Sequence, residues 1–303
     1  MDSNTGKILK QFRKNRNLSQ IEVATGIISR QAYSKIERGI SEPNYDIFQS
    51  ILNRLNYNMT DFLNENNNQS GENSYYKLLL KGLDNTLTSQ EAETLYNYVN
   101  NNKSSNSKIM HLYGRVIGHL HHKFPAIIPY FSQDDKDLFK KYIFHLKGHY
   151  SLNDLQIIGD FATISMDKEE LCKFYEQLPD FSTSDYAFDI TSYQIQINKI
   201  YNNFCDVFLA NNNLIHAADS IKKQKKFLAV RMDLRYAFYL KINEIALTFK
   251  QTKNERVLLE LLNIADTMES VGDKSTAKAI RYQYKTYIDA SPYLPENALT
   301  PDK

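Results

Sequence analysis

Apolar residues recur at intervals of three and four along most of this chain of 303 residues. That spacing places side chains on one face of an α-helix. The clearest runs cover residues 190–208 and 257–268. The alternation of apolar and polar residues that is typical of strands is weak throughout. The pattern therefore predicts an all-α protein.

Helix starts are marked at two places, because Thr88 with Glu91 and Ser19 with Glu22 have the spacing of a capping box. Roughly ten helices with short loops follow residue 74, which favours helical pairs stacked as a tetratricopeptide-like right-handed solenoid. This prediction is architectural, since no repeated motif is visible and the chain has no Trp. Beyond the runs above, helical spacing occurs at residues 87–99, 109–120, 138–146, 152–164, 171–178, 227–249 and 277–288.

One polar stretch divides the chain. The letters NENNNQSGENS, which begin at Asn64, include no apolar residue that could face a core. We expect a first domain at residues 1–64 and a linker at 65–74. A helical-repeat domain for effector binding and dimerisation should follow at 75–290. Residues 291–303 are predicted to be a disordered tail, because they contain proline and little periodicity.

The segment LSQIEVATGIISRQAYSKIERG, residues 18–39, has the pattern of two short helices joined by a bend. Ser19 and Ser29 can cap the two helices, Gly26 can open the bend, and Gly39 can end the second helix in a left-handed conformation. These features predict a five-helix bundle with a helix-turn-helix at its centre. Its small core should contain Ile8, Phe12, Leu18, Val23, Ile28, Ile36, Phe48, Ile51, Leu52 and Leu55.

Gln20, Ala24, Glu37 and Gly39, with Arg13 upstream, resemble the helix-turn-helix of phage-repressor-like (XRE) regulators. The bend is one residue shorter than in the phage repressors. With SRQAYSKIERG and ILNRLNYNMTDFL, it is similar to the Rgg (Rgg/GadR/MutR) regulators of low-GC Gram-positive bacteria. The resemblance implies that an arginine–glutamate pair joins the first helix to the recognition helix. It also implies a homodimer and, as ligand, a short secreted signalling peptide that is taken back into the cell.

The start of the second helix should enter the major groove of double-stranded promoter DNA, where each base pair presents a distinct set of donors and acceptors. Arg30 can bond guanine and Gln31 can bond adenine. Tyr33 can touch a thymine methyl or pack in the bundle, and Gln20 can contact a phosphate or a base edge. The candidate DNA-binding residues are Gln20, Ser29, Arg30, Gln31, Tyr33, Ser34 and Lys35.

Charge and size refine this prediction. The first 63 residues hold nine Lys and Arg against six Asp and Glu, a net charge of +3, whereas the whole chain has +2. One domain of this size buries too little surface for tight site-specific binding, so we expect a homodimer that reads two half-sites. The apolar helices from Val257 onward are the predicted dimer surface.

Stacked helical pairs form a concave face that suits an extended peptide, whose buried backbone groups need polar partners. For each candidate, a surface position or an interhelical salt bridge is the alternative interpretation. The candidate peptide-binding residues are Arg115, Gln194, Asn198, Tyr201, Arg231 and Arg235.

Other functions have little support. No run of apolar residues is long enough to span a membrane, and no signal-peptide core is present, so we expect a cytoplasmic protein. Cys172 and Cys205 lie in apolar helical patterns and are expected in the core. His145 and His149 have helical spacing but no accompanying metal motif, so we expect no metal, no cofactor and no enzyme activity. The alternative to a regulator is a ligand-independent helical scaffold, or a protein antagonist, that uses the N-terminal bundle for docking.

Overall fold

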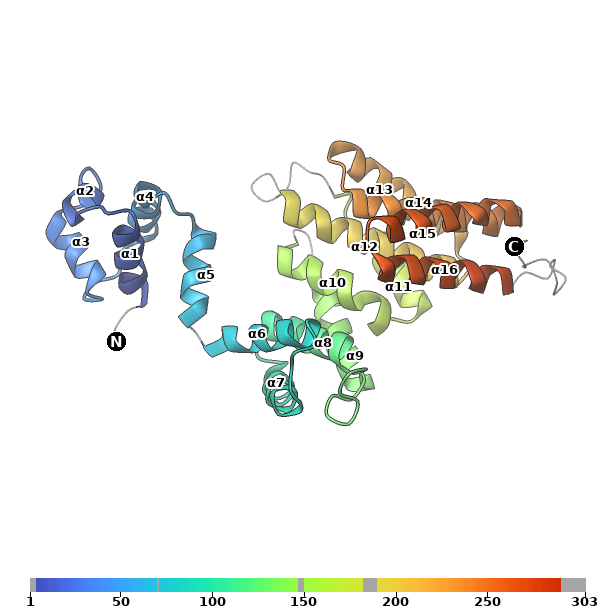
Figure 1. Ribbon diagram of the computed structural model, residues 1–303, viewed down its shortest axis with the longest axis horizontal. Coiled ribbons are helices and arrows are strands. Elements are labelled where there is room, and N and C mark those ends of the chain that lie inside the picture. Colours follow the sequence, from blue (N-terminus) through green and yellow to red (C-terminus); the bar gives the residue numbers. More distant parts are fainter. Residues whose placement is uncertain (1–3, 70, 147–149, 182–189, 290–303) are drawn as a thin grey trace. The chain divides into compact units, whose positions relative to one another are not determined.

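The computed structural model describes residues 4–69, 71–146, 150–181 and 190–289. These ranges contain sixteen α-helices, a short 3-10 helix and no strand, so the all-α prediction is confirmed (Figure 1). Contacts divide the chain into an N-terminal unit, residues 1–100 with 119–128, and a C-terminal unit, residues 101–118 with 129–303. No helix of the described ranges is both long and apolar enough to cross a membrane.

The first five helices form the predicted bundle. They share one apolar core, to which α1, α2, α3 and α4 each contribute buried residues, and both serine caps form as expected. Ser19 and Glu22 make a complete capping box, and Gly26 and Gly39 have positive φ angles of 77° and 70°. The helices are α1 (Asn4–Asn15), α2 (Gln20–Ala24), α3 (Arg30–Glu37), α4 (Tyr45–Leu55) and α5 (Met59–Gln69).

The segment predicted to be a linker is helical on both sides of residue 70, in α5 and in α6 (Gly71–Leu83). Asn58 and Asp61 cap α5 reciprocally, at 2.8 and 2.9 Å between donor and acceptor. Asn66 and Glu65 accept hydrogen bonds from the side chains of α1, so polar contacts hold this helix where apolar residues are lacking. The linker prediction missed this because it considered only the burial of apolar residues.

After α5, the first hundred residues contain α6 and most of α7 (Ser89–Asn102). The rings of Tyr75 and Tyr98 stack with their centroids 3.6 Å apart. The predicted capping box of Thr88 and Glu91 forms, and Glu91 also pairs with Lys81 at 2.5 Å. Aromatic stacking and a capped helix start therefore fix this helical hairpin.

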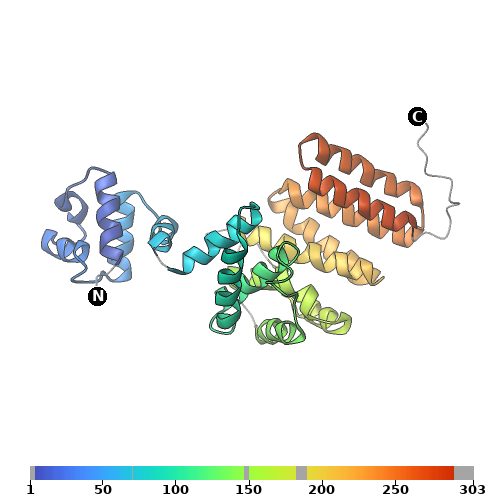
Figure 2. The same cartoon turned by 60° about the horizontal axis from the view of Figure 1, so that its bottom comes forward.

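Consecutive helices of the C-terminal unit pack against each other, as expected for a helical repeat. The contacts join α9 to α10, α12 to α13, α13 to α14 and α15 to α16, and α12 also contacts α14 (Figures 1 and 2). The helices are α8 (Ser107–Leu120), α9 (Gln133–His145), α10 (Leu152–Ser165), α11 (Lys168–Gln177), α12 (Ile190–Ala210), α13 (Leu214–Val230), α14 (Leu234–Thr252), η2 (Glu255–Leu258), α15 (Leu259–Ser270) and α16 (Lys274–Asp289).

A half-buried carboxylate joins three of these helices. Asp160 on α10 bonds His111 on α8 at 2.8 Å and pairs with Lys199 on α12. Burial alone would raise the pKa of Asp160, but the hydrogen bond from His111 and the charge of Lys199 hold it below its ordinary value. Cys205 is buried as predicted, whereas Cys172 is only half-buried.

Two glycines one turn apart on α8 provide a matched test of the packing in the C-terminal unit. A Cβ at Gly114 would lie 2.3 Å from Cζ of Phe161 and 2.9 Å from Cζ of Phe139, whereas a Cβ at Gly118 would meet nothing within 4 Å. We expect Gly114→Ala to lower the free energy of unfolding by about 1–3 kcal/mol because the rings must move.

Gly118→Ala should instead raise the free energy of unfolding by about 0.5–1 kcal/mol, because alanine favours the helix. Thermal unfolding followed by circular dichroism measures both variants. Equal effects of the two substitutions would contradict the close packing of α10 and α9 against Gly114.

Candidate DNA-binding site and ligand groove

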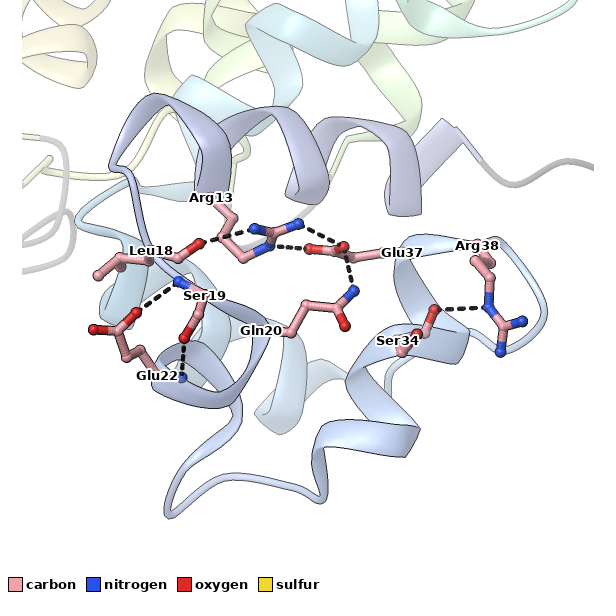
Figure 3. Close-up of polar contacts among 8 residues, drawn as sticks. All are labelled: Arg13, Leu18, Ser19, Gln20, Glu22, Ser34, Glu37 and Arg38. Atoms are coloured by element: carbon pink, nitrogen blue, oxygen red, sulfur yellow. Dashed lines mark hydrogen bonds and ion pairs between the residues drawn. The ribbon is translucent and has the colours of Figure 1, made fainter.

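A charge pair between α1 and α3 organises the N-terminal bundle (Figure 3). Nε of Arg13 lies 2.5 Å from one carboxylate oxygen of Glu37, and Nη2 lies 3.0 Å from the other. The remaining guanidinium nitrogen donates to the carbonyl oxygen of Leu18 at 2.8 Å, just before α2 begins. One guanidinium therefore joins α1, the start of α2 and the end of α3, which places the two helices of the helix-turn-helix.

Gln20 completes this arrangement by donating from Nε2 to Glu37 at 2.8 Å. Burial alone would raise the pKa of Glu37, but the hydrogen bonds from Arg13 and Gln20 outweigh it and hold the pKa below the ordinary 4.5. The Glu37 side chain is only 1% exposed, so the carboxylate depends on these donors. Gln20 is thus fixed in orientation while it still faces the outer surface of α3.

The exposed face of α3 forms a shallow hollow of about 280 Å³. Gln31, Ser34, Lys35 and Arg38 follow one another at the i, i+3, i+4 and i+7 positions of a single helical row. Arg38 was not among the predicted DNA contacts, although the spacing of this row would have revealed it. The residues that line the hollow are Gln20, Arg30, Gln31, Ser34, Lys35 and Arg38.

Two of the candidate DNA-binding residues, Tyr33 and Ser29, have a structural role in the bundle. Tyr33 is 0% exposed and lies in the core of the bundle, so it takes the packing position and not the one facing a thymine methyl. Its helical row is that of Ile36 and Glu37, the buried side of α3. The Ser29 hydroxyl accepts a hydrogen bond from the backbone N–H of Ala32 at 3.1 Å and therefore caps the recognition helix.

A groove of about 690 Å³ lies on one side of the C-terminal unit, where every second helix contributes: α12, α14 and α16. Asn243 on α14 donates to Asn202 on α12 at 3.1 Å across its floor. Amides and tyrosines alternate with aliphatic side chains along the lining. The lining residues are Asn202, Asp206, Leu209, Ala210, Tyr239, Ile242, Asn243, Lys250, Ser275, Thr276, Ala279, Ile280, Tyr282, Gln283, Thr286 and Tyr287.

None of the predicted peptide-binding residues lines this groove. Gln194, Asn198 and Tyr201 are buried, because the part of α12 that carries them packs inside the unit. The Gln194 amide bonds the backbone oxygen of Arg231, and the Asn198 amide donates to the backbone of its own helix.

The arginines among these candidates lie elsewhere too. The guanidinium of Arg231 bonds the Thr191 hydroxyl, Arg235 is exposed, and Arg115 is half-buried on α8. The row that does face the groove contains Asn202, Asp206 and Leu209 on α12. The polar pair Asn202 and Asp206 at i and i+4 was the available signal in the sequence.

Within the described ranges, the fold brings together no group of three His, Cys, Asp or Glu side chains that could hold a metal ion. Nδ1 of His145 lies 2.5 Å from the backbone oxygen of Lys141, so a helix carbonyl occupies this ring nitrogen. His149 lies outside the described residues.

Residues 9–62 match the family model of the helix-turn-helix. The N-terminal bundle is a helix-turn-helix domain. Within it, α2 and α3 are the two helices of the motif, and the Arg13–Glu37 pair lies between the first helix and the recognition helix.

Solved structures share the fold of nearly the whole chain. A mutant form of PrgX is 17% identical with a TM-score of 0.70, and the match covers 97% of both chains. A putative transcriptional regulator from Listeria monocytogenes EGD-e is 17% identical with a TM-score of 0.69, covering 95% of this chain and 98% of that one. The Streptococcus dysgalactiae SHP pheromone receptor Rgg2 is 12% identical with a TM-score of 0.70, covering 93% and 99%. The helix-turn-helix domain followed by helical repeats is therefore a shared all-helical architecture.

The lowered pKa of Glu37 predicts how the stability of the helix-turn-helix domain depends on pH. Above pH 4.5 the carboxylate is ionised in both the folded and the unfolded chain, so its full contribution to stability is present. As the pH falls through 4.5 toward the lower folded pKa, the unfolded chain binds the proton first and this contribution is lost.

Glu37→Gln should remove that part of the pH dependence and, at neutral pH, weaken the domain by about 2 kcal/mol through loss of charge-assisted bonds. Hydrogen exchange of peptides from α1 to α3, corrected for intrinsic rates, measures the local opening free energy. Peptides from α12 to α14 serve as the internal control. Identical pH profiles of α1 to α3 in the two proteins would contradict the role of the pair.

Proposed function

We propose that this protein is a sequence-specific DNA-binding transcriptional regulator controlled by a short signalling peptide. The observation that carries the proposal is the exposed row on α3, held in place by the buried Arg13–Glu37 pair. Its side chains are hydrogen-bonding and cationic, and they project from a helix of the type that enters the major groove. The alternative function, a bundle that docks onto another protein, does not account for a rigidly held surface of cationic and amide side chains.

Each residue of the row has a role in the proposed complex. Arg30 and Gln31 are exposed at the start of α3 and are assigned to base edges, guanine and adenine respectively. Lys35 and Arg38 are assigned to phosphates, which position the helix. Gln20, which its hydrogen bond to Glu37 orients, is assigned to the neighbouring DNA backbone.

We propose that the protein acts as a homodimer in the cytoplasm, since a single domain offers few base contacts. Most apolar residues from Val257 onward are used inside the unit, where they form a core with α14. Leu259, Val271 and Tyr282 stay exposed in this region, at 52%, 73% and 74%; Tyr282 lines the groove, so Leu259 and Val271 are assigned to the dimer surface.

The groove between α12, α14 and α16 is the proposed peptide site. Structures with the same fold include PrgX complexes with cCF10 and with iCF10, and a pheromone receptor, Rgg2. The Asn202 and Asn243 amides suit the N–H and C=O groups of an extended peptide, and the apolar lining suits its side chains. Peptide binding would favour one of two arrangements of the dimer. The affinity of the dimer for DNA would change with the populations of these arrangements.

The DNA assignment predicts the effect of a double substitution on the full-length chain. Selection from a random duplex library should give a preferred sequence, and Arg30→Ala with Gln31→Ala should abolish the preference. The expected loss is about 1–3 kcal/mol for each bidentate contact, measured by fluorescence anisotropy at fixed salt.

Lys10→Ala is the control, because it removes the same charge from an exposed position of α1. It should retain the sequence preference and lose only part of the general affinity. If the folded wild-type protein enriches no sequence, the scaffold function replaces the regulator. If the double variant keeps the preference, α3 is not the reading helix.

The peptide assignment can be tested with a single fluorophore, because the chain has no Trp. Tyr282 lines the groove and is 74% exposed, so Tyr282→Trp places one indole at the site. A synthetic pool of apolar hexapeptides should shift its emission to shorter wavelength in a saturable way, because ligand excludes water from the ring. Tyr130→Trp, at a 55% exposed position outside the groove, should not respond. No response at position 282 would contradict peptide binding in this groove.

A further inference from the structure

The groove contains two charged residues of opposite sign in an otherwise uncharged lining. Asp206 projects from α12 and Lys250 from α14. Relative to the hydrogen bond between Asn202 and Asn243, Asp206 lies four residues and Lys250 seven residues further along their helices. At 1.5 Å per residue these offsets are about 6 Å and about 10 Å in the direction of the helix ends. Both charges also lie beside Tyr287 on α16: the Lys250 ammonium is 5.9 Å from its ring centroid, and burial together with the charge of Asp206 raises the pKa of its hydroxyl, so the two charges belong to the same end of the groove.

Neither charge has a counter-ion among the described residues. Asp206 accepts a hydrogen bond from the Asn202 amide at 3.2 Å, and the ammonium of Lys250 lies 5.9 Å from the ring centroid of Tyr287. Of the other charged residues of α14, Lys241 pairs with Glu260 at 2.7 Å and Glu244 pairs with Lys225, whereas Arg235 is exposed at the start of the helix. The groove therefore holds two charges that have no ion-pair partner among the described residues.

The surroundings within the groove disfavour the charged form of both residues. The carboxyl of Asp206 is accessible to water but lies within the concavity, and desolvation raises its pKa to about 7 against the opposing effect of Asn202. Desolvation, followed by repulsion from Lys253, lowers the pKa of Lys250. Each shift is the one expected of a charge without a partner. A ligand that supplies both opposite charges would relieve both penalties.

We propose that the ligand is an apolar peptide recognised through two charges, its C-terminal carboxylate at Lys250 and an ammonium group at Asp206. This inference rests on the proposed peptide function and specifies which peptides the groove accepts. Because the two residues share one end of the groove, the ammonium and the carboxylate must lie within a few residues of each other. The ammonium comes from the N-terminus of a very short peptide or from a lysine side chain near the C-terminus.

The test uses synthetic pools of apolar peptides, three and six residues long, with and without lysine near the C-terminus. Each pool is prepared with free ends, with an acetylated N-terminus and with an amidated C-terminus. The full-length protein is incubated with each pool, and peptides retained after ultrafiltration are quantified by mass spectrometry. The variants are Lys250→Met and Asp206→Asn, which keep the shape of the side chains.

Matched controls are Lys278→Met on α16 and Asp134→Asn on α9, exposed positions outside the groove. Amidation should reduce retention by wild-type protein about tenfold, the effect of one lost charge-assisted hydrogen bond, and should have no effect with Lys250→Met. Acetylation should reduce retention of the tripeptides if the N-terminus supplies the ammonium. It should leave lysine-containing hexapeptides unaffected if the side chain does. Asp206→Asn should remove whichever dependence is found.

The outcomes separate the two proposals. Retention that ignores both end groups, and that is unchanged in Lys250→Met and Asp206→Asn, overturns the two-charge recognition and leaves the peptide function standing. No retention of any pool above that of the control without protein overturns the peptide function and the inference together. Equal losses in the Lys278→Met and Asp134→Asn controls would show a general effect of protein charge and would also overturn the inference.

Discussion

The placement of the recognition helix depends on one buried charge pair. Arg13 satisfies both oxygens of Glu37 and, with its third nitrogen group, the backbone oxygen that precedes α2. Removing either partner of such a pair leaves the other buried without compensation, which costs more than the intact pair contributes. The pair therefore defines the geometry of α1, α2 and α3 more than it adds to stability. The exposed row of α3 is held in a fixed orientation, because Glu37, at the end of the buried row of the same helix, is bound by Arg13.

The C-terminal unit solves a different problem, since it must leave a groove open without losing its core. Consecutive helices pack in pairs, and alternate helices α12, α14 and α16 turn one row of side chains to the groove. The opposite rows carry the packing, as Tyr201 and Phe204 show by their burial. Separate rows of the same helix thus serve packing and binding. Leu209, Ile242 and Ile280 belong to both, since they are buried and also line the groove, whereas its two charged residues remain accessible to water.

The sequence predicted the elements and the N-terminal site better than the groove. Helical spacing, serine caps and Gly39 are local signals, and the Arg13–Glu37 pair followed from a resemblance. The groove depends on which row of each helix faces its neighbours, a property of tertiary packing that spacing alone does not contain. Gln194 and Asn198 precede Asn202 in the same i, i+4 series of α12, yet they are buried inside the unit, whereas Asn202 lines the groove. The helical α5 beyond residue 64 was missed for a related reason, because side-chain bonds to α1 hold it in place of apolar burial.

Exposed groove residues and buried packing residues can change separately. Substitutions at exposed groove positions such as Tyr282 can change the surface of the groove while the buried residues keep the packing. The solved proteins with this fold share 12–18% identity with the chain, at TM-scores of 0.67–0.70 over more than nine-tenths of its length. One helical scaffold can therefore carry different groove surfaces without a new fold for each.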